Sequence, residues 1–345
     1  MAKHTLYLFL VTFGLLLSST CVCAQDVAPD NVEAEGPIIE AATRFKPRPK
    51  FLVYETELLR DFTVIPTSAI VGDAQANVSQ NLIREGKLKF PMVLKERTKI
   101  IGGLGYRHEQ FKFSEQSDEV YPLFTRFDDK SLKRLSFSAY MQQILKEKKF
   151  VYIYFNSSLN SDRPGSENIN YQLKWSVAGI YGKQHGPHKQ LGFGASFGYD
   201  FGQPAAYPVL MFNNDFSLHW GYELLLPKSA KLRYSPNLSN HFIGALELQG
   251  ASYSLQDSLF SGFDLLEFRR SSVRALLTYE RELHDWLWFG VTAGYRFPIN
   301  LFISEPGDRR ADALMKIDAD PTPYLSFSIF LVPPNKMYNR AKGSG

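Results

Sequence analysis

Cysteine is nearly missing from this chain of 345 residues, and both copies, Cys21 and Cys23, stand close to its start. They fall inside the segment that we interpret below as a secretory signal peptide. A mature chain without cysteine excludes disulfides, thiolate metal sites and cysteine nucleophiles. Cysteine chemistry can therefore be set aside when we consider what the mature protein does.

A strong charge of either sign is missing as well. The 39 Lys and Arg residues nearly balance the 35 Asp and Glu residues, and the formal net charge is +4. The charges are spread along the chain instead of forming a basic stripe, so nucleic-acid binding is not predicted. Phosphate-loop and dinucleotide fingerprints are also missing, and we predict no cofactor.

Long apolar runs are confined to residues 6–17. The remainder of the chain has no run of 18 or more apolar residues, which excludes a transmembrane helix. The run at 6–17 follows a short basic start and precedes small residues as far as Ala24, the pattern of a secretory signal peptide over residues 1–24. The alternative is a lipoprotein acylated at Cys21, but the bulky Thr20 before it disfavours that interpretation.

Aromatic residues, by contrast, are abundant, with 27 Phe, 18 Tyr and 4 Trp, and many stand in alternating segments. In residues 286–303, every odd-numbered residue is apolar, whereas Gly, Thr, Arg and Asn occupy most even-numbered positions. A period of two predicts a strand with one apolar face, and this strand is longer than the roughly 5–6 residues usual in soluble domains. Similar stripes occur at residues 169–177, 189–202, 216–226 and 325–331.

Two kinds of fold could use such strands, a soluble sandwich or a membrane barrel. The length of the strands favours the barrel, as do the Gly, Ser and Thr of the second face and the aromatic residues near strand ends. A closed barrel is also the β structure that leaves no unpaired edge in lipid. We therefore predict an all-β fold, an antiparallel transmembrane β-barrel in the bacterial outer membrane.

The connections between the predicted strands mostly alternate between long and short, as outer loops and periplasmic turns do. With a first strand near residues 51–59, the count is fourteen strands, and both termini lie in the periplasm. Twelve is the alternative count, if residues 209–212 and 232–235 are not full strands. The three longest polar connections, which we place outside the cell, are residues 114–130, 156–167 and 304–321.

The predicted organisation has four parts. A signal peptide covers residues 1–24, a periplasmic tail or small plug covers 25–49, the barrel covers 50–332, and a C-terminal tail covers 333–345. For the last hairpin of the barrel, we predict a register in which Tyr279 faces Phe289, Leu277 faces Val291 and Arg274 faces Gly294. A slip of one residue would reverse both faces.

Two segments resemble a known family. Residues 88–113 (LKFPMVLKERTKIIGGLGYRHEQFKF) and 220–253 (WGYELLLPKSAKLRYSPNLSNHFIGALELQGASY) are similar to the Bacteroidota outer-membrane β-barrel proteins of unknown function. The resemblance covers most of the chain after about residue 50, and its motifs, such as the LLLP turn, are structural. It implies a fold and a location, and it implies no activity that could be transferred to any residue.

Charged residues on the predicted inward face carry both signs. Either they pair across the lumen and plug it, or they line a narrow aqueous path. We favour a mostly filled or constricted lumen, into which the segment 25–49 could also fold. The lumen-facing candidates are Arg134, Lys174, Asp200, Glu223, Glu247, Arg274, Glu280 and Arg296.

The best catalytic candidate is the set Ser217, His219 and Glu223, since a serine needs an adjacent base to become a nucleophile. Residues two apart on one strand face point roughly parallel, however, and no oxyanion-hole donor can be assigned. We therefore predict no catalytic residue. His185 and His188 could bind a metal, but they stand in a predicted turn without a carboxylate close by, and we predict no metal site.

The preferred function is a non-enzymatic outer-membrane channel, transporter or envelope scaffold of unknown cargo. Its predicted partners are outer-membrane lipid and either a small-molecule cargo or an envelope protein. One alternative is a lipid hydrolase or acyltransferase that uses Ser217 and His219. Another is a carrier of hydrophobic molecules that resembles the fourteen-stranded fatty-acid transporters, for which an apolar lumen would be the mark; the predicted inward face looks polar.

Overall fold

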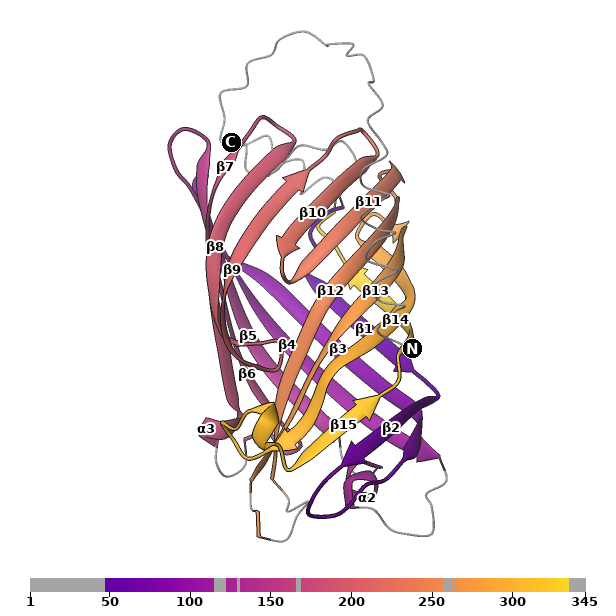
Figure 1. The fold of residues 1–345 in the computed structure, drawn as a ribbon. Helices are drawn as coiled ribbons and strands as arrows, with labels where there is room; N and C mark the ends of the chain where they lie inside the picture. The colour runs from indigo at the N-terminus through magenta and orange to yellow at the C-terminus, as the bar shows by residue number, and fades with distance from the viewer. Residues whose placement is uncertain are drawn as a thin grey trace. The chain divides into compact units, whose positions relative to one another are not determined.

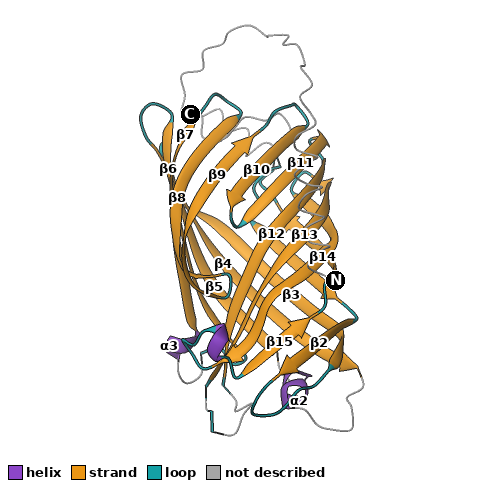
Figure 2. Ribbon diagram, viewed as in Figure 1, coloured by secondary structure: helices purple, strands orange, loops and turns teal. Residues whose placement is uncertain are grey.

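Long antiparallel strands dominate the computed structural model, as the alternating sequence predicts (Figures 1 and 2). The structure describes residues 47–114, 122–128, 131–165, 169–256, 262–263 and 265–334. All of these belong to the unit Pro37–Gly345. The predicted signal peptide at 1–24, the predicted tail up to residue 46 and the chain from residue 335 lie outside the described residues.

The first and last strands of the barrel are each interrupted once. β1 (Leu52–Leu59) continues as β2 (Phe62–Thr67), and β15 (Met315–Ala319) continues as β16 (Thr322–Leu331). The interrupted first strand pairs with the interrupted last strand in a single register. Leu52 faces Leu331 in β1–β16, and Thr67 faces Lys316 in β2–β15. The other strands are β3 (Ala76–Leu94), β4 (Thr98–Ser114), β5 (Ser131–Ile144), β6 (Lys149–Ser161), β7 (Leu173–Gln184), β8 (Lys189–Asp200), β9 (Gln203–Asn214), β10 (Trp220–Leu226), β11 (Ser229–Asn237), β12 (Asn240–Leu255), β13 (Leu266–His284) and β14 (Leu287–Ser304).

Hydrogen-bonded ladders close these strands into a barrel. Each strand from β3 to β14 pairs with its neighbour in the sequence, β14 pairs with β16, and β1 pairs with both β16 and β3. With the two interrupted strands counted once each, the barrel has fourteen strands, which confirms the predicted count. The alternative of twelve is wrong because residues 209–212 and 232–235 belong to the paired strands β9 and β11.

The connections sort onto the two ends of the barrel. We call one the turn end; it carries the connections 95–97, 145–148, 185–188, 215–219, 238–239 and 285–286. The opposite loop end carries the described parts of the three connections predicted to lie outside the cell. Two of these connections are shorter than predicted, because residues 156–161 belong to β6 and residues 315–319 form β15. Residues 115–121, 129–130 and 166–168 of the predicted connections lie outside the described residues. The first and last described residues lie at the turn end, where Arg48 contacts Asp285 and the Val332 amide donates to the Trp286 carbonyl.

Short helices also stand at the loop end (Figure 2). They are α2 (Pro122–Asp128), α3 (Ile169–Gln172) and the 3-10 turn Arg310–Asp312. The sequence showed no helical period, because segments this short contain at most two turns. The predicted stripe at 169–177 is therefore wrong at its start, where Ile169 and Tyr171 belong to α3. Within the described residues, no helix has the length and apolar character needed to cross a membrane.

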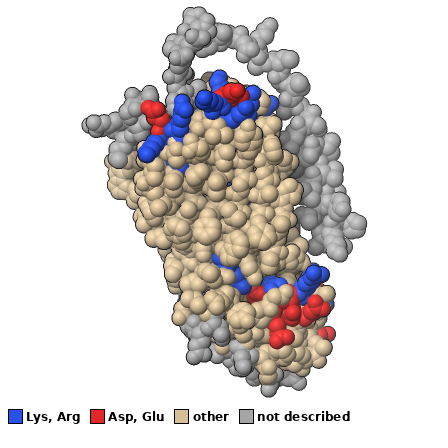
Figure 3. Space-filling model, turned by 90° about the vertical axis from the view of Figure 1, so that its left-hand side faces the viewer, with Lys and Arg blue, Asp and Glu red and all other residues tan. Residues whose placement is uncertain are grey.

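The outward face of the strands is apolar and exposed. Phe193, Leu277 and Phe327 are 65%, 63% and 56% exposed, whereas Gly192 and Ser326, on the opposite parity, are buried. Figure 3 shows one side of the molecule with a broad band nearly free of charged residues, and Lys, Arg, Asp and Glu gather toward its ends. An exterior of this kind is the lipid-facing surface of a transmembrane barrel.

The barrel wall is shorter along the strand direction on one side, because β10 and β11 are short strands. Beyond Glu247, β12 loses β11 as a partner and instead approaches β6 through a bridge between Ser254 and Ser161. The β8–β9 turn packs against this part of β12 at Gly250. A Cβ atom at Gly250 would come within 1.9 Å of the Phe201 backbone, so the contact requires glycine.

The predicted register of the β13–β14 hairpin is wrong by two residues. Tyr279 faces Val291, Leu277 faces Ala293 and Arg274 faces Arg296, because the turn is a tight one and a bulge follows between Glu282 and His284. The inward and outward faces remain as predicted, since side chains repeat every two residues along a strand.

Candidate functional site in the barrel lumen

A cavity of about 540 Å³ lies inside the barrel. Its wall begins with the segment REGKLK of β3, whose alternation directs Glu85, Lys87 and Lys89 to the lumen. The facing positions of β4 are glycines. Cβ atoms built at Gly103 and Gly105 would lie only 2.6 Å from the Ser138 Oγ and 2.5 Å from the Ser136 Oγ, so the glycines leave room for these two serine side chains of β5.

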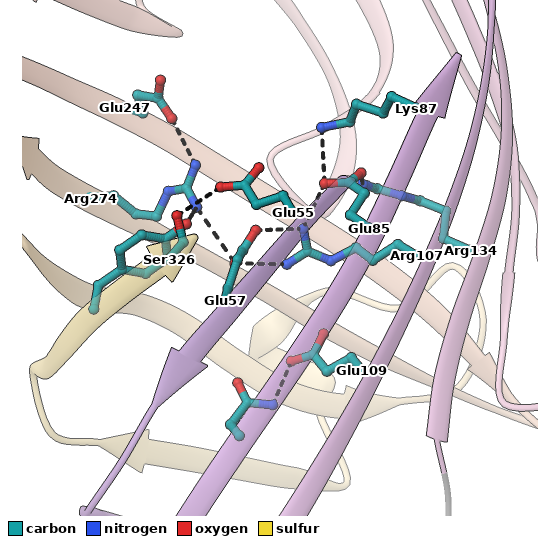
Figure 4. Close-up of polar contacts among 12 residues, drawn as sticks. Glu55, Glu57, Glu85, Lys87, Arg107, Glu109, Arg134, Glu247, Arg274 and Ser326 are labelled. Atoms are coloured by element: carbon teal, nitrogen blue, oxygen red, sulfur yellow. Dashed lines mark hydrogen bonds and ion pairs between the residues drawn. The ribbon is translucent and has the colours of Figure 1, made fainter. Parts of the chain in front are cut away.

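A chain of alternating charges runs along the inner wall (Figure 4). It starts at Lys231 on β11 and ends at Arg134 on β5, so it reaches strands on both sides of the β1–β16 seam. Each link is an ion pair of 2.7–3.7 Å between side chains of opposite sign. Its members, in order, are Lys231, Glu247, Arg274, Glu57, Arg107, Glu85 and Arg134.

Arg107 is the central link of this chain. Its guanidinium Nη1 lies 3.2 Å from Glu57 of β1 and 3.3 Å from Glu85 of β3. All three residues are less than 10% exposed. Buried charges are costly unless they are paired, and the alternation of sign along the chain meets that requirement.

A second ion pair crosses the lumen between β13 and β4. The two terminal nitrogens of Arg270 lie 2.5 Å from the two carboxylate oxygens of Glu109. Glu109 is fully buried, and the Asn81 side-chain amide donates to it at 3.0 Å. A bidentate Arg–carboxylate pair of this kind fixes both distance and orientation, so it ties two walls that are far apart in the sequence.

A third cluster stands at the loop end, beneath the shorter side of the wall. The Lys174 ammonium of β7 lies 2.6 Å from Glu267 of β13, and Arg269 and Ser252 also donate to that carboxylate. The Asn160 amide donates to the Ser252 carbonyl at 2.9 Å. The contacts therefore join β6 and β7 to β12 and β13 where β8–β11 do not reach.

The remaining predicted lumen residues have varied surroundings. Asp200 accepts hydrogen bonds from Ser196 and Tyr207, both at 2.8 Å, and Glu280 lies 2.5 Å from the Lys50 ammonium. Arg296 lies over the Phe62 ring at 5.6 Å. Glu223 stands opposite Asn213 and Lys231 in the ladders of β10. Of the eight candidates, those that line the cavity are Arg134, Lys174, Asp200, Arg274 and Arg296.

The interior is less polar than the sequence suggested. At the loop end, Phe127 of α2 contacts Phe111 of β4 and Phe268 of β13, with ring centroids 5.7 Å and 5.2 Å apart. These rings belong to a buried apolar cluster that includes Leu123 and Phe124 of the same helix. Helix α2 thus covers the loop end of the cavity with apolar side chains.

A smaller cluster at the turn end accounts for an inward-facing tryptophan. Trp288 is 2% exposed, and the His241 ring stacks on it with centroids 5.3 Å apart. The Arg48 guanidinium lies 5.8 Å from the centre of the Trp288 ring, and Phe330 packs beside it. The chain just before β1 therefore contributes a cation to the packing at this end of the lumen.

The catalytic candidate does not assemble. Ser217 and His219 lie in the turn before β10 and not on the strand itself, and Ser217 is exposed. The Ser217 oxygen accepts from the His219 and Trp220 amides, while the His219 Nδ1 lies 2.8 Å from the Ser235 carbonyl. His185 and His188 are exposed in the β7–β8 turn. The Ser217 side chain is therefore not held against the imidazole as a nucleophile must be.

The one group of described acidic residues close enough to share a metal ion is Glu55, Glu57 and Glu85. Protein cations already surround it. Arg107 contacts Glu57 and Glu85, and Lys87 lies 2.9 Å from Glu85. The carboxylates therefore act as partners of arginine and lysine side chains.

Several ion-pair partners were missed by the sequence analysis, namely the buried residues Glu57, Glu85, Arg107, Glu109 and Glu267 and the partly buried Arg270. The parity of β3 and β4 could have placed Glu85, Arg107 and Glu109 inside, because their neighbours Leu104 and Leu88 are outward apolar residues. The pairing of Arg270 with Glu109 left no such signal, since these residues are remote in sequence.

Comparison with known proteins gives weak likenesses. No family model matches the chain, and no curated protein matches it. Solved structures that are similar include an outer-membrane channel from Pseudomonas putida F1 (10% identity, 83% of this chain and 97% of that chain, TM-score 0.41). Another is the Pseudomonas putida toluene transporter TodX (7% identity, 87% of this chain and 93% of that chain, TM-score 0.38). A third is a Pseudomonas aeruginosa FadL homologue (7% identity, 85% of this chain and 96% of that chain, TM-score 0.34). Our assignment of the barrel rests on the ladders described above.

Proposed function

We propose that the protein is a non-enzymatic outer-membrane channel or transporter for small molecules. The observation that carries this proposal is the combination of a closed barrel, an apolar exterior and a charged cavity of about 540 Å³ in the lumen. A cavity of this size suits a small solute. The serine and histidine considered for catalysis lie outside this cavity, at the turn end.

Uptake by liposomes that contain the purified full-length protein tests the proposal. Solutes of graded size should enter, and entry should fall when Ser136, which lines the cavity, is changed to tryptophan. Phe137→Trp on the same strand is the matched control, because Phe137 is exposed on the outward face. Equal uptake by liposomes with and without the protein would contradict the proposal.

A carrier of hydrophobic molecules is the second candidate, and the apolar loop end favours it. Phe111, Phe127 and Phe268 border the cavity there, and we would expect a neutral apolar fluorescent probe to be retained by the purified barrel. Phe268→Gln should reduce that retention. Retention that is the same in the variant would remove the support for this candidate.

The identity of the family also belongs to this proposal. We infer from residues 88–113 and 220–253 that the chain is similar to Bacteroidota outer-membrane barrels of unknown function. Expression in a Bacteroidota host, followed by separation of outer and inner membranes, would test whether the protein is targeted there. Recovery in the soluble fraction would count against this assignment.

A further inference from the structure

The charges that line the cavity are strongly unequal in number. Three acidic residues line it, Glu57, Glu85 and Asp200. Nine basic residues line it: Lys87, Lys89, Arg107, Arg134, Lys174, Lys228, Arg270, Arg274 and Arg296. The near balance of the whole chain therefore conceals a cavity with an excess of positive charge.

Ion pairs with carboxylates reduce the excess of positive charge in the cavity, but they do not remove it. Glu109, Glu247 and Glu267 neutralise lining cations from positions that do not themselves line the cavity. When these are added, nine basic residues still face six acidic ones. The residual positive charge is concentrated on cations that have no carboxylate within ion-pair distance among the described residues, namely Lys89, Lys228 and Arg296.

These three cations are available to a solute and stand on different parts of the wall. Lys89 and Lys228 are exposed within the barrel, and Arg296 is half-buried. The Lys89 amide bonds to Phe51 at the start of β1, toward the turn end, whereas Arg296 lies over Phe62 of β2, toward the loop end. Lys228 reaches from the β10–β11 turn to within 5.7 Å of the Tyr154 ring.

Each of these cations is held without an acid. Phe62 and Tyr154 present ring faces, which attract a cation and leave its charge available to other partners. Lys89 faces Gly103 across the β3–β4 ladder. A low-dielectric wall that carries charges of one sign concentrates ions of the opposite sign.

We propose that the cavity binds and selects small anions that carry a carboxylate or phosphate group, and that Lys89, Lys228 and Arg296 are separate contact points for such a group along the cavity. This inference rests on the proposed function for its role in transport, and the binding site itself does not require transport. It predicts a preference by charge, which neither the barrel fold nor the net charge of the chain implies.

The test uses the purified full-length protein in two measurements. In planar bilayers with a potassium chloride gradient, the reversal potential should show that chloride permeates better than potassium. In detergent, equilibrium dialysis should show that phosphate and benzoate bind, while neutral benzyl alcohol does not. The triple variant K89Q/K228Q/R296Q should lose the chloride preference and weaken the binding of both anions by about tenfold or more, which is about 1.4 kcal/mol.

The matched control is K95Q/K146Q/K183Q, which removes the same charge from exposed positions that do not line the cavity. Heat-modifiable gel mobility checks folding, and the single variants K89Q and K228Q replace the triple variant if it does not fold. Phosphate that an organic solvent extracts from the purified wild type, and in a lower amount from the triple variant, would identify a lipid headgroup as the bound anion.

The outcomes separate the two proposals. Anion binding that is lost in the triple variant, in a barrel that passes no solute, would support the site and reject the transport function. A barrel that conducts without preferring chloride and binds benzyl alcohol as well as benzoate would reject the anion site. Equal losses in the triple variant and its control would also reject it, because the effect would then come from net charge alone.

Discussion

The two faces of the barrel wall follow one rule of alternation and yet tolerate different changes. On the outside, apolar side chains such as Leu277 and Phe327 are exposed, and each contacts lipid independently of the others. On the inside, charges such as Glu109 and Arg107 are buried in groups whose members depend on one another. The exterior therefore constrains the class of each residue, whereas the interior constrains which residues occur together.

The largest effect should come from breaking an interior pair. Glu109→Ala leaves Arg270 without its carboxylate, and we expect a loss of about 3–5 kcal/mol in the free energy of unfolding, the usual scale for an orphaned buried charge. Urea titration of the barrel in lipid vesicles measures it. Glu109→Gln keeps an acceptor for Asn81 and should lose less; equal stability of all three proteins would mean that the pair is dispensable.

The next effect should come from adding a charge outside. Leu277→Arg on β13 should cost about 2–4 kcal/mol near the bilayer midplane. Leu277→Trp, at the same position, should be tolerated, because lipid accepts a larger apolar group while a packed core would be strained by one. Folded yield on heat-modifiable gels distinguishes the two, and a failure of Leu277→Trp would show that this face is packed against protein.

A smaller effect should separate two glycines of β12. Gly250→Ala forces the β8–β9 turn away from the wall, and overpacking of this kind costs about 1–3 kcal/mol. Gly244→Ala is the control on the same strand, because a Cβ there meets nothing within 4 Å. The midpoint of urea unfolding should move in the first variant only, and equal shifts would indicate that strand propensity, not contact, causes them.

The smallest effect should come from the exposed ion pair between Glu147 and Lys149 at the turn end of the barrel. A hydrogen bond from Lys149 lowers the pKa of the Glu147 carboxyl in the β5–β6 turn. Any stabilisation from this depressed pKa is present above the ordinary carboxyl pKa and is lost as the pH falls through the lowered value. Both groups are exposed to water, so Glu147→Gln should leave the unfolding midpoint unchanged at neutral pH. A clear shift would show that the turn contributes more than a surface pair does.

The contrast between the faces also explains what the sequence could predict. Fourteen strands and their outward residues, such as Phe193 and Phe327, follow from a local period of two. The β13–β14 register was wrong by two residues because an even shift returns every side chain to its own face. Local patterns therefore determine the face of a residue and leave its partner open.

The cavity needed information that no local pattern holds. Inward parity identified Lys174, Arg274 and Arg296, but the acid that neutralises each cation, or the lack of one, depends on strands that meet across the lumen. Arg270 finds Glu109, whereas Arg296 finds the Phe62 ring. Helix α2, which covers the loop end, was missed because a helix of seven residues shows little periodicity.

The pairing of the first strand with the last sets the order in which the protein can be made. Leu52 faces Leu331, so the ribosome must release nearly the entire chain before the cylinder can be sealed. A nascent chain that ends before Thr322 would leave the edges of β1 and β14 without partners, a state that lipid does not tolerate. Contacts between residues so far apart form late and slowly. We therefore expect the unsealed chain to depend on chaperones and an insertion machinery that shield these two edges until the last strand arrives.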